Sequence, residues 1–141
     1  MIELFQTDTG SSVLLPFADE GIRAGFPTPA QDYLDVAIDL NHELIAHPQS
    51  TFYGRVRGNS MEDAHVFNGD ILVIDKSLNP RDGDMAVCFL EGEFTLKTIR
   101  ITAEEILLVP ANPDYPTIHV TESDDFTIWG IVTYCIHKTR R

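Results

Sequence analysis

From residue 51 onward, short apolar runs alternate with turn residues along the chain. Strands are expected over residues 51–58, 71–77, 85–90 and 93–101, with further candidates over 106–110, 117–120 and 126–137. The turns between the first of these are Asn68-Gly69-Asp70, Asp82-Gly83-Asp84 and the tight hairpin link Glu91-Gly92. Short strands at this spacing predict a compact, mainly β domain.

A helical pattern precedes the strands, over residues 28–38. Thr28 suits an N-cap, Pro29 the first helical position and Gln31 the third. The apolar residues that then recur at helical spacing, and predict a single stripe, are Ala30, Tyr33, Leu34, Ala37 and Ile38. Asp39 is expected to cap a second short helical turn, which Pro48 closes.

Residues 1–27 show no sustained period and carry glycine or proline at five positions. We interpret them as an extended, flexible arm with at most one short strand. The predicted organisation is therefore an arm over residues 1–27 and a β-rich domain over residues 28–141, with one or two short helices.

The charge of the chain argues against nucleic acid as a direct partner. Ten lysines and arginines stand against 22 aspartates and glutamates, which makes a formal net charge of −12. Binding to a phosphate backbone depends on basic side chains that displace counterions, so this field opposes it. We expect protein partners and no direct nucleic-acid binding.

The chain is expected to be cytoplasmic and free of the membrane. No apolar run approaches the roughly 18 residues of a spanning helix, and the first residues lack the basic start and apolar stretch of a secretory signal. The two cysteines, Cys88 and Cys135, each lie in an apolar run. In a reducing compartment such residues are expected to be small buried thiols and not a disulfide.

The segment "HELIAH" resembles a zinc-binding helix only superficially. His42 and His47 are five residues apart, so on a helix they diverge by about 140° and cannot bind one metal from the same face. Elsewhere the sequence shows no cluster with metal-ligand spacing. No metal and no cofactor are expected.

Ser60 stands in the turn Gly58-Asn59-Ser60-Met61. It is not in the Gly-x-Ser-x-Gly elbow of the α/β-hydrolases, since Glu62 occupies the second glycine position. His65 or His119 could serve as its base, but the spacing singles out neither. A turn of this composition is also common without any catalytic role.

Lys97 offers a different base for that serine. In the expected strand 93–101 it shares a face with Thr95 and Ile99, whereas Phe94 and Leu96 lie on the other face. Burial favours the neutral amine, and a neutral lysine can take the proton of a serine hydroxyl. The alternative is a solvated lysine on an outer strand face.

Four segments in order resemble a known family. They are "AGFPTPAQDYLDVAIDLNHELIAHP", "GNSMEDAHVFNGDILVIDKS", "GDMAVCFLEGEFTLKTI" and "LLVPANPDYPTI". Together they make the chain similar to the UmuD branch of the LexA-type self-cleaving serine–lysine peptidases, over nearly its whole length. The lysine follows the serine by 37 residues.

This resemblance implies a mainly β, LexA- and UmuD-like domain, with Ser60 as nucleophile, Lys97 as general base and Ala24-Gly25 as the bond that is cut. Backbone N–H groups of Asn59 and Ser60 are expected to stabilise the oxyanion. Relatives often carry Asp or Met where this chain has Asn59, but the position contributes mainly backbone. The resemblance also implies a homodimer, stimulation by the RecA–single-stranded-DNA filament, and action of the trimmed form with a UmuC-type Y-family polymerase in lesion bypass.

Two other functions compete with this one. The chain could be a non-enzymatic dimeric interaction domain related to the C-terminal half of a repressor. It could also be a peptidase of the signal-peptidase kind that acts on other chains, although no membrane anchor is visible in the sequence.

Overall fold

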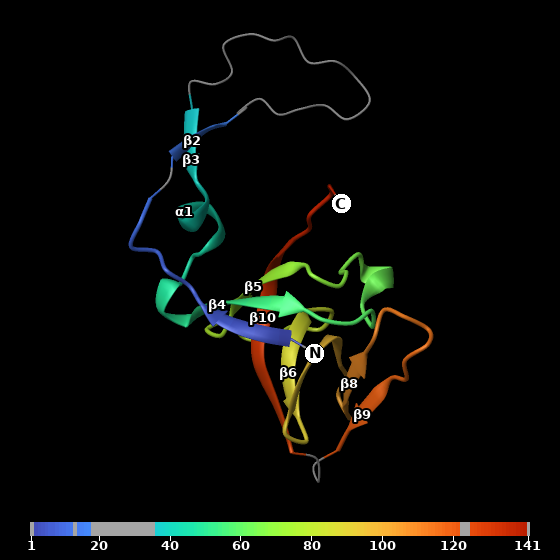
Figure 1. The fold of residues 1–141 in the computed structure, drawn as a ribbon. Coiled ribbons are helices and arrows are strands. Elements are labelled where there is room, and N and C mark those ends of the chain that lie inside the picture. The colour runs from blue at the N-terminus through green and yellow to red at the C-terminus, as the bar shows by residue number, and fades with distance from the viewer. Residues whose placement is uncertain (1, 13, 18–35, 122–124, 141) are drawn as a thin grey trace. The chain divides into compact units, whose positions relative to one another are not determined.

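A single antiparallel sheet dominates the computed structural model, which describes residues 2–12, 14–17, 36–121 and 125–140. Its strands follow the order β1-β4-β5-β10-β6-β7-β8-β9 (Figure 1). In chain order they are Ile2–Gln6 (β1), Thr51–Val56 (β4), Ile71–Asp75 (β5), Met85–Leu90 (β6), Glu93–Ile101 (β7), Ile106–Val109 (β8), Ile118–Val120 (β9) and Phe126–Ile136 (β10). The predicted mainly β fold is confirmed, and β6 and β7 match their predicted bounds to the residue.

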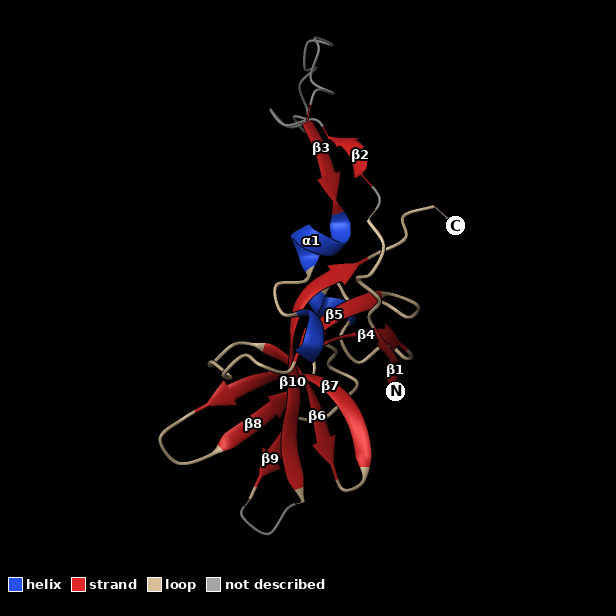
Figure 2. Cartoon of the chain, turned by 90° about the vertical axis from the view of Figure 1, so that its left-hand side faces the viewer, coloured by secondary structure: helices blue, strands red, loops and turns tan. Residues whose placement is uncertain are grey.

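The helices within the described residues are short, as Figure 2 shows in blue. They are α1 (Leu40–Leu44) and the 3-10 helices η2 (Pro48–Ser50) and η3 (Glu62–Ala64). Asp39 caps α1 as predicted, because its side chain accepts a hydrogen bond from the Asn41 backbone N–H. The hairpin link is also confirmed, since Glu91 and Gly92 both have positive φ, as a two-residue turn of this kind requires.

The predicted helix over residues 28–38 is wrong where the structure describes it. Residues 28–35 lie outside the described residues, but Val36–Asp39 is a strand, β3, paired with β2 (Leu14–Phe17). Val36 and Ile38 are β-branched, and antiparallel pairing with β2 satisfies this backbone in place of helical hydrogen bonds. Apolar residues two apart fit a strand as well as a helix over so short a span.

The chain forms two compact units, residues 1–7 with 49–141 and residues 8–48. The first contains the eight-stranded sheet, and the second contains β2, β3 and α1. The boundary predicted between residues 27 and 28 falls outside the described residues, so the division into arm and domain stays a prediction. The expectation of at most one short strand within residues 1–27 was wrong, because β1 and β2 both lie there, each paired with a strand from later in the chain.

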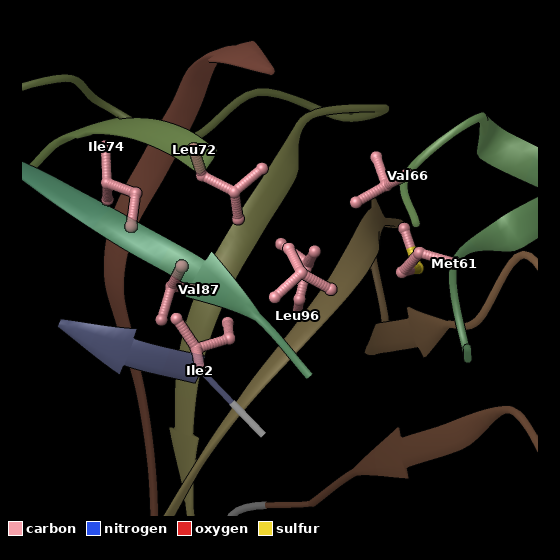
Figure 3. Close-up of a cluster of buried hydrophobic side chains, with 8 residues drawn as sticks. Ile2, Met61, Val66, Leu72, Ile74, Val87 and Leu96 are labelled. Carbon is pink, nitrogen blue, oxygen red and sulfur yellow. The ribbon is translucent and has the colours of Figure 1, made fainter. Parts of the chain in front are cut away.

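Two apolar clusters lie on the two faces of β6 and β7. One of them, shown in Figure 3, includes Val87 and Leu96, which are paired across the two strands. The other contains Ala86, Cys88 and Ile99. Because successive strand residues point to opposite faces, Lys97, which is paired with Ala86, lies on the face of the second cluster.

The two cysteines differ in burial. Both are free thiols; Cys88 is buried as expected, but Cys135 is exposed, so the expectation of a buried thiol was wrong there. β10 pairs with β6 over Phe126–Ile131 and with β5 over Ile131–Ile136. The second half of β10 therefore has a strand neighbour on one side alone, and its side chains are correspondingly open to solvent.

Candidate active site

The loop that carries Ser60 is anchored at both ends. It leaves β4 at Val56, whose backbone N–H donates to the carbonyl of Asp70. Gly58 follows with a φ of 104°, which favours glycine, and its N–H donates to the Asn68 side chain. Directly after the serine, Met61 is buried in the first apolar cluster (Figure 3). These contacts hold Ser60 in place between two fixed points.

Lys97 reaches Ser60 from the middle of β7. Its Nζ donates a hydrogen bond to Ser60 Oγ over 3.2 Å. The lysine is only 8% exposed, so the alternative of a solvated lysine on an outer strand face is wrong. The structure therefore brings together the two side chains that the sequence singled out.

Burial lowers the pKa of the Lys97 amine below its ordinary value. A charge on Cys88, on the same face of the neighbouring strand, acts in the opposite direction but does not outweigh burial. Burial raises the pKa of its thiol to about 12, although the charge of Lys97 acts in the other direction. The thiol is thus neutral near pH 7 and supplies no anion to the lysine. Among the described residues no carboxylate forms an ion pair with Lys97, so no opposite charge compensates the cost of burying the ammonium.

Two backbone donors beside the serine are available to a substrate. Within the part of the chain that the structure describes, the N–H groups of Asn59 and Ser60 donate no hydrogen bond. These are the groups predicted to stabilise an oxyanion. A site for nucleophilic attack on a peptide carbonyl needs free N–H groups beside the nucleophile. They stabilise the negative charge that develops on the carbonyl oxygen, because they are already in position.

The loop after β8 holds the serine loop through three hydrogen bonds, two of them to Asn59. Asn112 donates from Nδ2 to the Asn59 carbonyl over 2.7 Å, and the Tyr115 hydroxyl donates to Asn59 Oδ1 over 2.7 Å. The Asp63 N–H donates to the carbonyl of Ala111 over 2.6 Å. Sequence reasoning missed Asn112 and Tyr115 as site residues. The only signal for them was their place in the motif "LLVPANPDYPTI", which carries no chemistry of its own.

A cavity of about 470 Å³ opens beside the two side chains. Its walls include Ile2, Val56, Ser60, Leu96, Lys97 and Tyr115. Arg57 and Glu93 also line the cavity, which is therefore partly polar, and the burial that lowers the pKa of the lysine comes from its own position in β7. A peptide backbone that enters this cavity lies beside Asn59, Ser60 and Lys97, all of which line it.

The other residues considered from the sequence are not part of this cluster. His119 contacts Glu105 through Nδ1 at 3.1 Å, and His65 ends η3 in a left-handed conformation. The only side chain that hydrogen-bonds to Ser60 Oγ, among those the structure describes, is that of Lys97. Ala24 and Gly25 lie outside the described residues.

Two further features concern the described residues as a whole. They contain no group of three or more His, Cys, Asp or Glu side chains arranged to hold a metal ion. None of their helices is long and apolar enough to cross a membrane.

Residues 16–133 match the family described as Peptidase S24-like. This chain belongs to the Peptidase S24-like family. Protein SamA of Salmonella typhimurium is 41% identical over 125 residues, which are 89% of this chain and 86% of SamA. Protein ImpA of Escherichia coli is 38% identical over 130 residues, 92% of this chain and 88% of ImpA. Protein MucA of Escherichia coli is 35% identical over 137 residues, 96% of this chain and 93% of MucA.

These relatives confirm the expected place of this S24-like chain in the UmuD branch. The family is one of serine peptidases, and it includes the self-cleaving LexA and UmuD group. The mainly β fold agrees with that membership.

Proposed function

We propose that this chain cleaves itself between Ala24 and Gly25, with Ser60 as the nucleophile and Lys97 as the general base. The observation that carries the proposal is the 3.2 Å contact between the Ser60 hydroxyl and a buried amine whose pKa is lowered. A serine hydroxyl is a weak nucleophile until an adjacent base accepts its proton. A neutral amine at hydrogen-bond distance is such a base.

In the first step, neutral Lys97 accepts the Ser60 proton while Oγ forms a bond to the carbonyl carbon of Ala24. The negative charge moves to the carbonyl oxygen, where the N–H groups of Asn59 and Ser60 stabilise it. One such donor is commonly worth about 3 kcal/mol in the transition state. The product is a tetrahedral intermediate beside a charged lysine.

In the second step, the bond between the Ala24 carbonyl carbon and the Gly25 nitrogen breaks. Lys97 returns its proton to that nitrogen, which leaves as the new amino terminus. Ser60 remains esterified to Ala24. Water then attacks the ester, Lys97 accepts its proton, and the released Ser60 oxygen takes that proton back.

The scissile bond and the active site belong to the same polypeptide, and this explains why such a site acts on its own chain. A bond held on the same polypeptide is presented at a high effective concentration, whereas a free peptide has to bind unaided. Small residues on both sides of the bond allow a close approach to a narrow cavity. An activator can then work by favouring the state in which the arm is docked.

We further propose that the RecA–single-stranded-DNA filament is that activator, and that the trimmed form acts as a homodimer with a UmuC-type Y-family polymerase in lesion bypass. Membership of the UmuD branch supports this role. The net charge of −12 supports protein partners with basic surfaces in preference to direct contact with DNA.

The test is to incubate the purified chain with activated RecA and to identify the products by mass spectrometry. A fragment that begins at Gly25 is expected, and Ser60→Ala and Lys97→Ala are expected to abolish it while the protein stays folded. Lys76→Ala is the matched control, because Lys76 lies outside the cavity and packs over the Trp129 ring. An intact chain under these conditions favours the non-enzymatic interaction domain instead.

A further inference from the structure

The first strand of the chain is an integral part of the catalytic sheet. β1 pairs with β4 along its whole length, from Ile2 opposite Val56 to Gln6 opposite Phe52. It lies at the edge of the sheet, beside β4, as Figure 1 shows in blue. Thr7, the next residue, adds a hydrogen bond from its hydroxyl to the carbonyl of Thr51.

The side chains of β1 divide into an inner and an outer face. Ile2 is 7% exposed and belongs to the first apolar cluster, and Leu4 packs against the same cluster. Phe5 is 48% exposed. Between the two inner residues, Glu3 forms an exposed ion pair with Arg57 at 2.9 Å. An extended peptide that adds to a sheet edge is recognised in this way, by backbone pairing and by pockets for alternate side chains.

The inner positions of β1 meet a surface that is shaped to receive them. A Cβ atom on Gly54, which is paired with Leu4, would lie 2.9 Å from Ile2 Cγ2. Only glycine leaves room there for the isoleucine side chain. Ile2 also forms part of the wall of the cavity beside Ser60. Its removal would open that wall and expose the edge of β4.

The connection from β1 back to β4 is the segment of residues 8–48, which contains the proposed cut. We propose that β1 is a separable strand ligand of the catalytic domain. After the chain is cut at Ala24-Gly25, the peptide of residues 1–24 stays bound along β4, with Ile2 and Leu4 as its anchors. The processed protein is then a non-covalent complex whose cavity wall is still complete.

This inference rests on the proposed function for the position of the cut, but it can be tested without the proposed chemistry. Ser60→Ala would remove self-cleavage, and residues 22–27 would be replaced by the recognition sequence of a site-specific protease. After digestion, gel filtration of a sample loaded at about 100 μM detects a complex whose Kd lies well below the diluted concentration on the column. The peptide is expected to elute with the domain of residues 28–141.

Two substitutions on β1 separate strand docking from nonspecific adhesion. Leu4→Asp places a charge at the inner face and is expected to weaken retention by about tenfold or more. Phe5→Asp places the same charge on the outer face and is expected to leave retention within about twofold. If Leu4→Asp prevents folding, a labelled synthetic peptide of residues 1–12 can be exchanged into the digested parent complex. Unlabelled peptides that carry Leu4→Asp or Phe5→Asp then compete with it, and their competing strengths are compared.

The proposal is overturned if the parent peptide separates from the domain, or if the inner and outer substitutions have equal effects. The wild-type chain could fail to cut itself while the protease-cut protein still retains its peptide. That combination of results would refute the proposed function and support the strand ligand.

Discussion

The Lys97 amine lies 3.2 Å from the Ser60 hydroxyl, although 37 residues separate them in the chain. Ser60 follows β4 and Lys97 lies within β7, and both strands belong to the same sheet. The folded sheet therefore both brings the two groups together and buries the amine. Experiments can test the proton transfer between these two side chains, the effect of the buried lysine on stability, and the contacts that position the serine loop.

Self-cleavage without an activator is expected to accelerate with pH. Burial lowers the pKa of Lys97, and only its neutral form accepts the serine proton. Below that pKa the rate is expected to rise by about tenfold per pH unit, because the neutral fraction rises in that proportion. Rates of fragment formation from pH 6 to pH 10 measure this. Lys97→Arg, which stays charged throughout, is expected to be inactive; a rate that is flat between pH 7 and 10 contradicts the proton step.

Lys97→Met is expected to stabilise the protein at neutral pH. An unfolded lysine holds its proton up to about its ordinary pKa of 10.5, whereas the folded amine releases it at lower pH. Between these two pKa values the unfolded state binds more protons, so the wild type gains stability as the pH rises. Removal of the buried charge should add on the order of 1 kcal/mol at pH 7.

Urea unfolding of the wild type and Lys97→Met at pH 7 and pH 10 tests this. The advantage of the variant should shrink at the higher pH. Lys76→Met is the control, since Lys76 lies over aromatic rings at the surface and its loss brings no such gain. A Lys97→Met protein that is less stable than the wild type at pH 7 would mean that the lysine charge is well solvated.

Asn112→Ala is expected to slow self-cleavage without changing its dependence on pH. Asn112 is 8% exposed, and its side chain donates to the carbonyl of Asn59, the residue whose N–H is proposed to stabilise the oxyanion. Loss of that contact loosens the donor geometry and should reduce the rate by about tenfold or more.

Tyr115→Phe removes one hydroxyl from the same loop and is the milder companion variant. Tyr115 is 43% exposed, and among the described residues its hydroxyl bonds to the Asn59 side chain alone, so a decrease of about two- to fivefold is expected. A shift in the pH midpoint in either variant would show that the loop acts on Lys97 and not on the oxyanion donors.

Asp70→Asn is expected to destabilise the fold by about 1–3 kcal/mol at pH 7. Asp70 is 3% exposed, and its carboxylate accepts from the Phe67 N–H at 2.9 Å and contacts His137 Nδ1 at 2.6 Å. Burial alone raises its pKa, but the bonds from His137, Phe67 and Cys135 outweigh this and lower it.

The pH dependence of that contribution follows from the same shift. Because the folded pKa of Asp70 lies below the ordinary value of 3.8, its stabilisation is complete above that value and is lost as the pH falls through the folded pKa. Denaturant unfolding between pH 2 and pH 6 should show a smaller difference between wild type and Asp70→Asn at the acid end. Asp63→Asn, at an exposed position, is the control with little effect.

Two glycines of the sheet are expected to reject alanine because a Cβ at each would meet a different atom of Ile74. A Cβ on Gly54 would lie 2.8 Å from Ile74 Cδ1, and a Cβ on Gly130 would lie 2.6 Å from Ile74 Cγ2. Each substitution should cost about 1–3 kcal/mol through overpacking. Ile74→Val removes Cδ1 but keeps Cγ2, so it should partly rescue Gly54→Ala and fail to rescue Gly130→Ala. Thermal unfolding of the double variants measures the difference, and equal rescue of both would contradict these contacts.

Local features of the chain could be predicted from the sequence alone. The bounds of β6 and β7, the hairpin turn at Glu91-Gly92 and the cap at Asp39 all depend on residues that are neighbours in the chain. The pairing of Ser60 with Lys97 was also anticipated, from one buried face of a strand and from the family motifs.

Only the tertiary structure decided which strands became neighbours and how deeply each side chain was buried. It made Val36–Asp39 a strand, placed Ile2–Gln6 at the edge of the sheet, exposed Cys135 and brought Asn112 to Asn59. Periodicity and propensity act over a few residues, whereas burial and hydrogen bonding depend on partners that the folded chain supplies from 19 or more positions away.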